Sequence, residues 1–213
     1  ITRAVFLQGT VPYRYIPALS ISLFLSANED DIRQAACAGY PAGYVLKSSH
    51  IDDPEDTELR IAFDFDGVIA DDESETIYQQ SKNIDQFHAH EQENVNKPHN
   101  PGLLKELLAK LSAIQKLEES KYQQDPSYKP RLRISIVTAR NAPSHERVIN
   151  TMRSWGITVN EAFFLGGIEK KKVLDVLKPH IFFDDQKTHL LPVSSTLPSV
   201  HIPFGSINAA PRP

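Results

Sequence analysis

Two aspartates stand at the end of an apolar stretch and are the residues best suited to chemistry. Asp64 and Asp66 close a stretch over residues 59–65, and Gly67 follows them. The stretch is typical of a buried strand, whereas Asp and Gly are poor strand residues and two like charges at one strand tip repel each other. A cation between the carboxylates, or a proton on one of them, would relieve that repulsion. An acidic turn is the alternative interpretation, because Asp and Gly also favour turns.

Polar side chains also follow three other stretches that we expect to be strands. They are Thr138 after residues 132–137, Lys170 after residues 162–165 and a glycine pair, and Asp184 with Asp185 after residues 181–183. Ligands of a parallel α/β sheet bind at the carboxyl ends of its strands, so we expect all of these groups at one edge. The carboxylates would hold a hard cation such as Mg²⁺, and the lysine and hydroxyl would hold an anion beside it. Together they predict phosphoryl transfer, with one aspartate as a covalent nucleophile.

Strand and helix patterns alternate along the chain, which predicts an α/β fold with a Rossmann-like, mostly parallel sheet. Further strands are expected over residues 2–7, 21–25, 44–46 and 200–203. Helices are expected to begin at Asn28, a good N-cap followed by acidic residues, and at Asn141. Gly67 permits the chain to turn after Asp66, with backbone N–H groups that face a bound phosphate.

Residues 71–130 interrupt this alternation, and we expect them to be an inserted helical cap. The catalytic core would then consist of residues 1–70 and 131–213. Within the cap, residues 76–93 have one hydrophilic helical pattern. A second helix is expected to start with Asn100 as N-cap and Pro101 as its first residue. Leucines recur at helical spacing after Pro101, and we interpret this stripe as a packing surface.

Composition excludes several classes of protein. The chain has 213 residues and a net charge of −4, so no global basic field points to nucleic acid. No apolar run approaches ~20 residues, so we expect no membrane span, and the cytoplasm is the simplest compartment. The single cysteine allows no internal disulfide. Whether the chain forms a homo-oligomer is left open.

A group of histidines and a glutamate inside the expected cap raises the alternative of a zinc site. His88, His90, Glu91 and His99 lie close in sequence, but Asn94 occupies the position that a second histidine of His-Glu-x-x-His requires. We therefore interpret these residues as a polar face of the cap, opposite the active site. The glycine-rich loops G-x-x-x-x-G-K and G-x-G-x-x-G are both absent from the sequence, which argues against ATP or NAD binding by those routes.

The order of these motifs resembles the haloacid dehalogenase superfamily of phosphotransferases. The matching segments are Asp64-Phe-Asp66-Gly-Val, Ile136-Val-Thr-Ala-Arg140, Lys170 and Phe182-Phe-Asp-Asp185. A closer resemblance is to the cytosolic 5′-nucleotidase type I family. It rests on Asp72-Glu-Ser-Glu75, His90-Glu-Gln-Glu-Asn94, Asn96-Lys-Pro98, Val137-Thr-Ala-Arg140, Arg153-Ser-Trp-Gly156, Phe164-Leu-Gly-Gly167 and Pro179-His-Ile-Phe-Phe-Asp-Asp-Gln186.

The resemblance implies a role for each site residue. Asp64 would be the nucleophile that forms an aspartyl-phosphate, and Asp66 would protonate the leaving oxygen and then activate water. The phosphoryl oxygens would be bound by Thr138 and Lys170, with Gly67 and Ala139 also contacting the substrate. Mg²⁺ would lie between Asp64, the carbonyl of Asp66 and an aspartate of the last pair, with Asp185 favoured over Asp184.

The core recognises phosphate only, so the choice of leaving group is expected to come from the cap. A nucleoside 5′-monophosphate is the expected substrate. Phe87 would stack on its base, although Phe87 and Tyr78 could equally dock the cap. Hydrogen bonds to base or ribose would come from His90, Glu91 and Asn94. Phosphatase action on sugar phosphates is the alternative function.

Overall fold

The computed structural model describes residues 4 and 7–208, which leaves residues 1–3, 5–6 and 209–213 undescribed. The strand expected over residues 2–7 therefore falls mostly outside the described residues. No helix in the described part of the chain combines the length and apolar character needed to cross a membrane.

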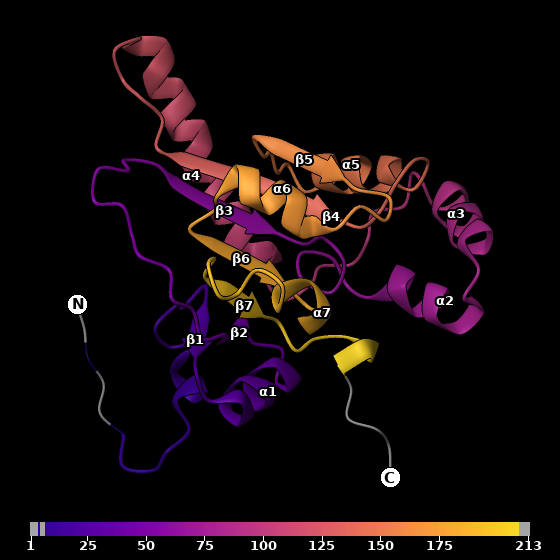
Figure 1. Ribbon diagram of the computed structural model, residues 1–213, viewed down its shortest axis with the longest axis horizontal. Coiled ribbons are helices and arrows are strands. Elements are labelled where there is room, and N and C mark those ends of the chain that lie inside the picture. The colour runs from indigo at the N-terminus through magenta and orange to yellow at the C-terminus, as the bar shows by residue number, and fades with distance from the viewer. Residues whose placement is uncertain (1–3, 5–6, 209–213) are drawn as a thin grey trace.

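A seven-stranded sheet runs through the molecule in the order β1-β2-β7-β6-β3-β4-β5 (Figure 1). Its strands are β1 Phe24–Ser26, β2 Ala42–Val45, β3 Leu59–Phe63, β4 Leu132–Thr138, β5 Glu161–Phe164, β6 Ile181–Asp184 and β7 Ser199–His201. Every neighbouring pair is parallel except β2 and β7, which are antiparallel. This confirms the predicted α/β fold with a mostly parallel sheet.

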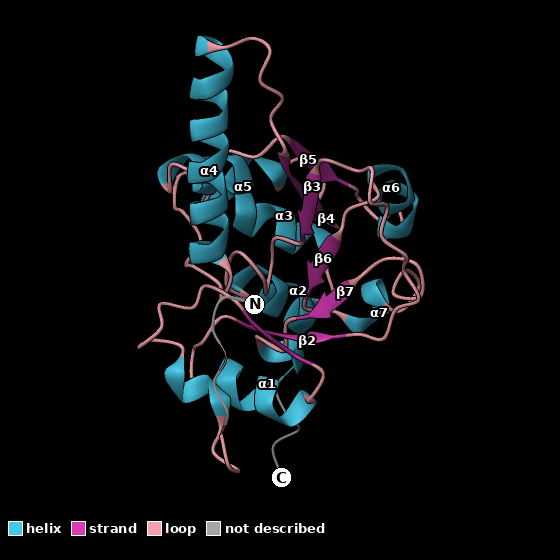
Figure 2. Ribbon diagram, turned by 90° about the vertical axis from the view of Figure 1, so that its left-hand side faces the viewer, coloured by secondary structure: helices cyan, strands magenta, loops and turns pink. Residues whose placement is uncertain are grey.

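Helices cover both faces of the sheet (Figure 2). They are α1 Glu29–Cys37, α2 Glu73–Ser81, α3 Ile84–Glu93, α4 Lys105–Gln124, α5 His145–Ser154, α6 Lys170–Leu177 and α7 Lys187–Leu190, with short 3₁₀ turns at Pro12–Tyr15 and Ser206–Asn208. Asn28 caps α1 as predicted, because its side chain accepts from the N–H groups of Asp30 and Asp31.

The last three residues of the central strand β3, Ile61 to Phe63, are buried on both faces, which explains why they are all apolar. Successive side chains of a strand point to opposite faces, so Phe63 and Ala62 enter different cores. Phe63 packs with Leu104 and Leu108 beside α4 and α5, and its ring stacks on that of Phe183 at 5.0 Å. Ala62 belongs to the second core, with Val137, Leu174, Phe182 and Leu190 beside α6 and α7.

Two expectations for residues 71–130 were wrong. Residues 76–93 form two helices rather than one, because Lys82 adopts a left-handed conformation and Asn83 caps a new helix. The next helix begins at Lys105 rather than at Pro101. Pro101 instead pairs with Ala70 in an isolated bridge, which brings the chain back against the end of the turn after Asp66.

Candidate active site

The carboxyl ends of the three central strands carry polar side chains that meet at one edge of the sheet. Strands β4 and β6 both pair with β3 in parallel, so Asp64, Thr138 and Asp184 reach the same edge. Lys170 is the first residue of α6, and its Nζ lies 2.8 Å from Oδ2 of Asp64 and 2.7 Å from Oδ2 of Asp184. The expected meeting of these groups is therefore confirmed, while their catalytic roles stay predictions.

Burial of so many charges perturbs their protonation. Burial raises the pKa of Asp64 to about 6, although Lys170 lowers it. Burial, followed by the charges of Asp64 and Asp184, raises the pKa of Asp185 to about 9. Burial alone would lower the pKa of Lys170, but the charges of Asp184 and Asp64 raise it, so the ammonium stays charged. One ammonium thus contacts two carboxylates, while the third, Asp185, lies near enough to be affected by all of these charges.

This crowding fits a divalent cation. Oδ1 of Asp185 is buried without a hydrogen-bond partner, whereas Asp184 is bound by Lys170, by the N–H of Gln186 at 2.8 Å and by His189. Ligand atoms of Asp64, Asp184 and His189 also lie within 4.8 Å of one another. Carboxylate oxygens are the ligands that Mg²⁺ prefers, so these residues match the expected cofactor.

Gly67 brings the turn after β3 close to the acidic pair. Its φ is +69°, and a Cβ at this position would lie 2.5 Å from Oδ2 of Asp185. Its N–H donates to the carbonyl of Asp71 at 3.3 Å rather than to the pocket. A glycine is therefore required here for close approach to Asp185.

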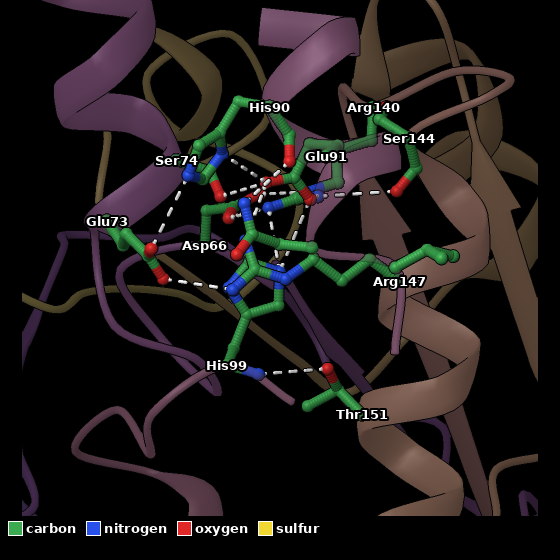
Figure 3. A network of polar contacts seen from close by, with 12 residues as sticks. Asp66, Glu73, Ser74, His90, Glu91, His99, Arg140, Ser144, Arg147 and Thr151 are labelled. Atoms are coloured by element: carbon green, nitrogen blue, oxygen red, sulfur yellow. Dashed lines mark hydrogen bonds and ion pairs between the residues drawn. The ribbon is translucent and has the colours of Figure 1, made fainter. Parts of the chain in front are cut away.

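Asp66 is held by an arginine to which sequence reasoning gave no role. Nε and Nη2 of Arg140 donate to its two carboxylate oxygens at 2.7 and 2.6 Å (Figure 3). Burial would lower the pKa of Arg140, but Asp66 and Glu91 raise it. The sequence position could have indicated this pairing. Arg140 lies two residues beyond Thr138, at the end of a strand expected to be buried, and a buried arginine needs a charged partner.

A cavity of about 350 Å³ opens beside these groups. Its lining residues are Asp64, Asp66, Glu75, Tyr78, Ile84, Phe87, Thr138, Ala139, Arg140, Asn141, Gly166, Gly167, Gln186 and His189. Its volume lies within the range that holds small ligands. Of the predicted site residues, Asp64, Asp66, Thr138, Ala139 and Phe87 therefore share this cavity.

The other predicted site residues do not line the cavity within the described part of the chain. They are Gly67, His90, Glu91, Asn94, Lys170, Asp184 and Asp185. Lys170 and the acidic pair are buried, and Lys170 contacts Asp64 directly. His90 contacts Glu73 and Glu91, and Asn94 donates to the carbonyl of His90 at 2.9 Å.

The prediction that the group of histidines and a glutamate forms an exposed polar face of the cap is wrong for two of its members. Glu91 and His99 are only 1% and 2% exposed. Both lie in a buried network with Arg140 and Arg147 (Figure 3). Two arginines bound to one glutamate explain why that charge is tolerated inside the protein.

Two aromatic residues of α2 and α3 face the cavity together. Tyr78 and Phe87 pack edge to face, with ring centroids 6.3 Å apart. The guanidinium of Arg140 lies 5.5 Å from the Phe87 ring, so Phe87 is packed as well as cavity-lining. Both interpretations of Phe87, docking and stacking, thus have a structural basis.

The fold and this edge of the sheet are consistent with a haloacid dehalogenase-like α/β core. The chain belongs to the 5′-nucleotidase family, whose sequence model matches residues 1–209. It is 33% identical over 183 residues to "Cytosolic 5'-nucleotidase 1B" of Homo sapiens, a match that covers 85% of this chain and 29% of that protein. The chain thus spans less than a third of the length of this relative. No solved structure gives a significant match.

Proposed function

We propose that the chain hydrolyses nucleoside 5′-monophosphates to nucleoside and phosphate, with Mg²⁺ as cofactor and Asp64 as nucleophile. The observation that carries the proposal is the place of Asp64, a buried carboxylate that directly follows the central strand and lines the cavity. Membership of the 5′-nucleotidase family supports the substrate class. A cytoplasmic location agrees with the name of the human relative.

The chemistry follows from groups of this chain. Asp64 would attack phosphorus, forming a new P–O bond while the bond to the 5′-oxygen breaks. Asp66 would give its proton to the leaving oxygen, then take a proton from the water that cleaves the aspartyl-phosphate. The N–H of Phe65 donates to Oδ1 of Asp64 at 2.7 Å, while Lys170 contacts Oδ2. These contacts fix the carboxylate for attack.

The phosphoryl group would be bound by the hydroxyl of Thr138 and the ammonium of Lys170. Mg²⁺, held by Asp64, the carbonyl of Asp66 and the Asp184–Asp185 pair, would neutralise charge that develops on the phosphoryl oxygens. Asp185 is the favoured partner of the pair because its Oδ1 is free.

Within the inserted block of residues 71–130, we assign the lid to helices α2 and α3. Both contribute cavity-lining side chains, Tyr78 from α2 and Phe87 from α3. Helix α4 instead packs on β4, and Leu108 lies in the main core. A lid of this kind excludes water and brings side chains to the nucleoside.

The direct test is phosphate release from a panel of nucleoside 5′-monophosphates and sugar phosphates, with Mg²⁺ and with EDTA. Nucleotides should be the best substrates, and EDTA should remove activity that added Mg²⁺ restores, because ligand atoms of Asp64 and Asp184 lie within 4.8 Å of each other. If sugar phosphates were cleaved faster than every nucleotide, the substrate assignment would be wrong. Full activity of metal-stripped protein in EDTA would refute the metal site.

Replacement of Phe87 by Ala tests nucleoside selection by the lid. A stack of a base on an aromatic ring contributes roughly 1–3 kcal/mol, so kcat/KM for a nucleotide should fall about 5- to 150-fold. Ribose 5-phosphate shares the leaving oxygen and lacks the base, so its kcat/KM should change much less. Tyr122→Ala, an exposed aromatic of α4 outside the cavity, is the matched control. Equal losses on both substrates would show that Phe87 only packs the lid.

A further inference from the structure

A continuous chain of charged contacts joins the lid to Asp66. Nε and Nη2, on one edge of the Arg140 guanidinium, donate hydrogen bonds to both carboxylate oxygens of Asp66. Its remaining nitrogen, Nη1, donates to Oε2 of Glu91, which belongs to lid helix α3 (Figure 3). Arg140 is 4% exposed, so it has little freedom to exchange these partners for water.

Glu91 is fixed in turn by groups on every side. Oε1 accepts from Nη1 of Arg147 at 2.9 Å and from the hydroxyl of Ser74 at 2.7 Å. Nε2 of His99 lies 3.4 Å from Oε2. Burial would raise the pKa of Glu91, but His99, Arg140 and Ser74 hold it well below its usual range, so the carboxylate remains charged. Glu91 therefore acts as a fixed anionic anchor for Arg140.

Asp66 needs such a support, because its backbone does not fix its side chain. Asp66 lies in a turn beyond the end of β3, where no strand ladder holds the chain. Its side chain is 18% exposed and lines the cavity. Arg140 occupies one lone-pair direction of each oxygen, which leaves another direction for the proton that Asp66 would give to the leaving oxygen.

We propose that Arg140 is a positioning residue that orients the carboxyl group of Asp66 toward the leaving oxygen. Because Arg140 is itself held by Glu91, this orientation depends on docking of the lid. The inference rests on the proposed function in one respect, since it takes Asp66 as the general acid. Nη1 of Arg140 also donates to the carbonyl of Ser144 at 3.3 Å, so α3 supplies the anionic partner of this nitrogen. Undocking of α3 would remove that partner and loosen the hold on the general acid, so that proton transfer is coupled to a closed lid.

The leaving group supplies a readout that a purely structural role would not change. The 5′-oxygen of a nucleotide or sugar phosphate leaves as a strongly basic alkoxide and needs a proton, whereas p-nitrophenolate leaves without one. Arg140→Lys keeps the charge but cannot form the two-pronged contact. Glu91→Gln keeps the shape and removes the anchoring charge. Glu93→Gln removes the same charge from an exposed position on α3 and is the matched control.

We expect kcat/KM for the alkyl phosphate that the wild type cleaves best to fall about 10²-fold in both variants, with KM little changed. The same variants should lose less than about 5-fold on p-nitrophenyl phosphate, and Glu93→Gln should match the wild type. Equal losses on both esters, or no loss on either, would overturn the proposal. A sugar phosphate as best substrate would refute the nucleotide assignment but not the positioning role, whereas a wild type inactive on every ester would refute both.

A double-mutant cycle covers the case in which a single variant folds poorly. Arg140→Lys is combined with Asp66→Asn, which keeps the shape of the side chain and removes the acidic group. If Arg140 acts through Asp66, Arg140→Lys should cause no further loss of kcat/KM for the alkyl ester in the Asp66→Asn background. Losses that multiply in the double variant would show that Arg140 acts independently of Asp66 and would overturn the proposal.

Discussion

Asp64→Asn is expected to lower kcat for phosphate release by at least about 10⁴-fold, because an amide cannot serve as the covalent nucleophile. The N–H of Phe65 and the ammonium of Lys170 contact different carboxylate oxygens of Asp64, and the single carbonyl oxygen of Asn can keep one of these two contacts. The substitution also removes one of three crowded buried carboxylates. The variant should therefore fold normally and lose only its chemistry.

The measurement is phosphate release from a nucleoside 5′-monophosphate at saturating substrate, with unfolding by urea as the check of the fold. Asp175→Asn, an exposed aspartate that pairs with Lys171 on α6, is the control and should keep wild-type activity. Substantial turnover by a well-folded Asp64→Asn variant would contradict the proposal that Asp64 is the covalent nucleophile.

Lys170→Met should have the largest effect on stability. Removing one partner of a buried ion pair typically costs about 3–5 kcal/mol, because the remaining charge is left without compensation. Here the loss leaves Asp64 and Asp184 facing Asp185 without an ammonium. Urea unfolding in EDTA should show this drop in the free energy of unfolding, together with loss of activity. Lys171→Met, at the next position and 41% exposed, should show neither.

The stability loss of Lys170→Met should depend on pH in a defined direction. Burial raises the pKa of Asp64 to about 6 and that of Asp185 to about 9, both above the ordinary 3.8. Between pH 3.8 and about pH 9, the folded chain therefore binds more protons than the unfolded chain, and stability falls as pH rises. Lys170 lowers both pKa values, so its removal should raise them further. The loss in free energy of unfolding caused by Lys170→Met should therefore be smaller at about pH 5 than at about pH 8. A deficit that is constant with pH would show that Lys170 does not compensate these carboxylates.

The catalytic edge could be predicted from sequence because it depends on local patterns and one topological rule. Asp64, Thr138 and Asp184 each follow a run of apolar residues, and parallel pairing of β3, β4 and β6 brings such ends together. The end of β4 at Thr138 agrees with the predicted strand, because its apolar run is long and ends at a polar residue. Lys170 could be placed for the same reason, since a glycine pair separates it from the end of β5.

The buried network could not be predicted, because its partners come from segments far apart in the sequence. Glu91 and Arg147 are separated by 56 positions and meet only when α3 lies against α5. The break between α2 and α3 was also hidden, because Lys82 adopts a left-handed conformation without a glycine to signal it. Pro101 forms a bridge with Ala70 and does not start a helix, although its sequence context favours a helix start. For the network and for Pro101, a tertiary contact outweighs the local pattern.

The most direct measurement is rapid acid quenching of the chain while it hydrolyses a nucleoside 5′-monophosphate radiolabelled at phosphorus. Asp66→Asn is used beside the wild type with radiolabelled p-nitrophenyl phosphate as its substrate, because that leaving group needs no proton while slower activation of water should let a phosphorylated intermediate accumulate. The account predicts label on the peptide that contains Asp64, released by hydroxylamine and absent from Asp64→Asn. Label on a different residue, or steady phosphate release with no labelled protein in either chain, would contradict it.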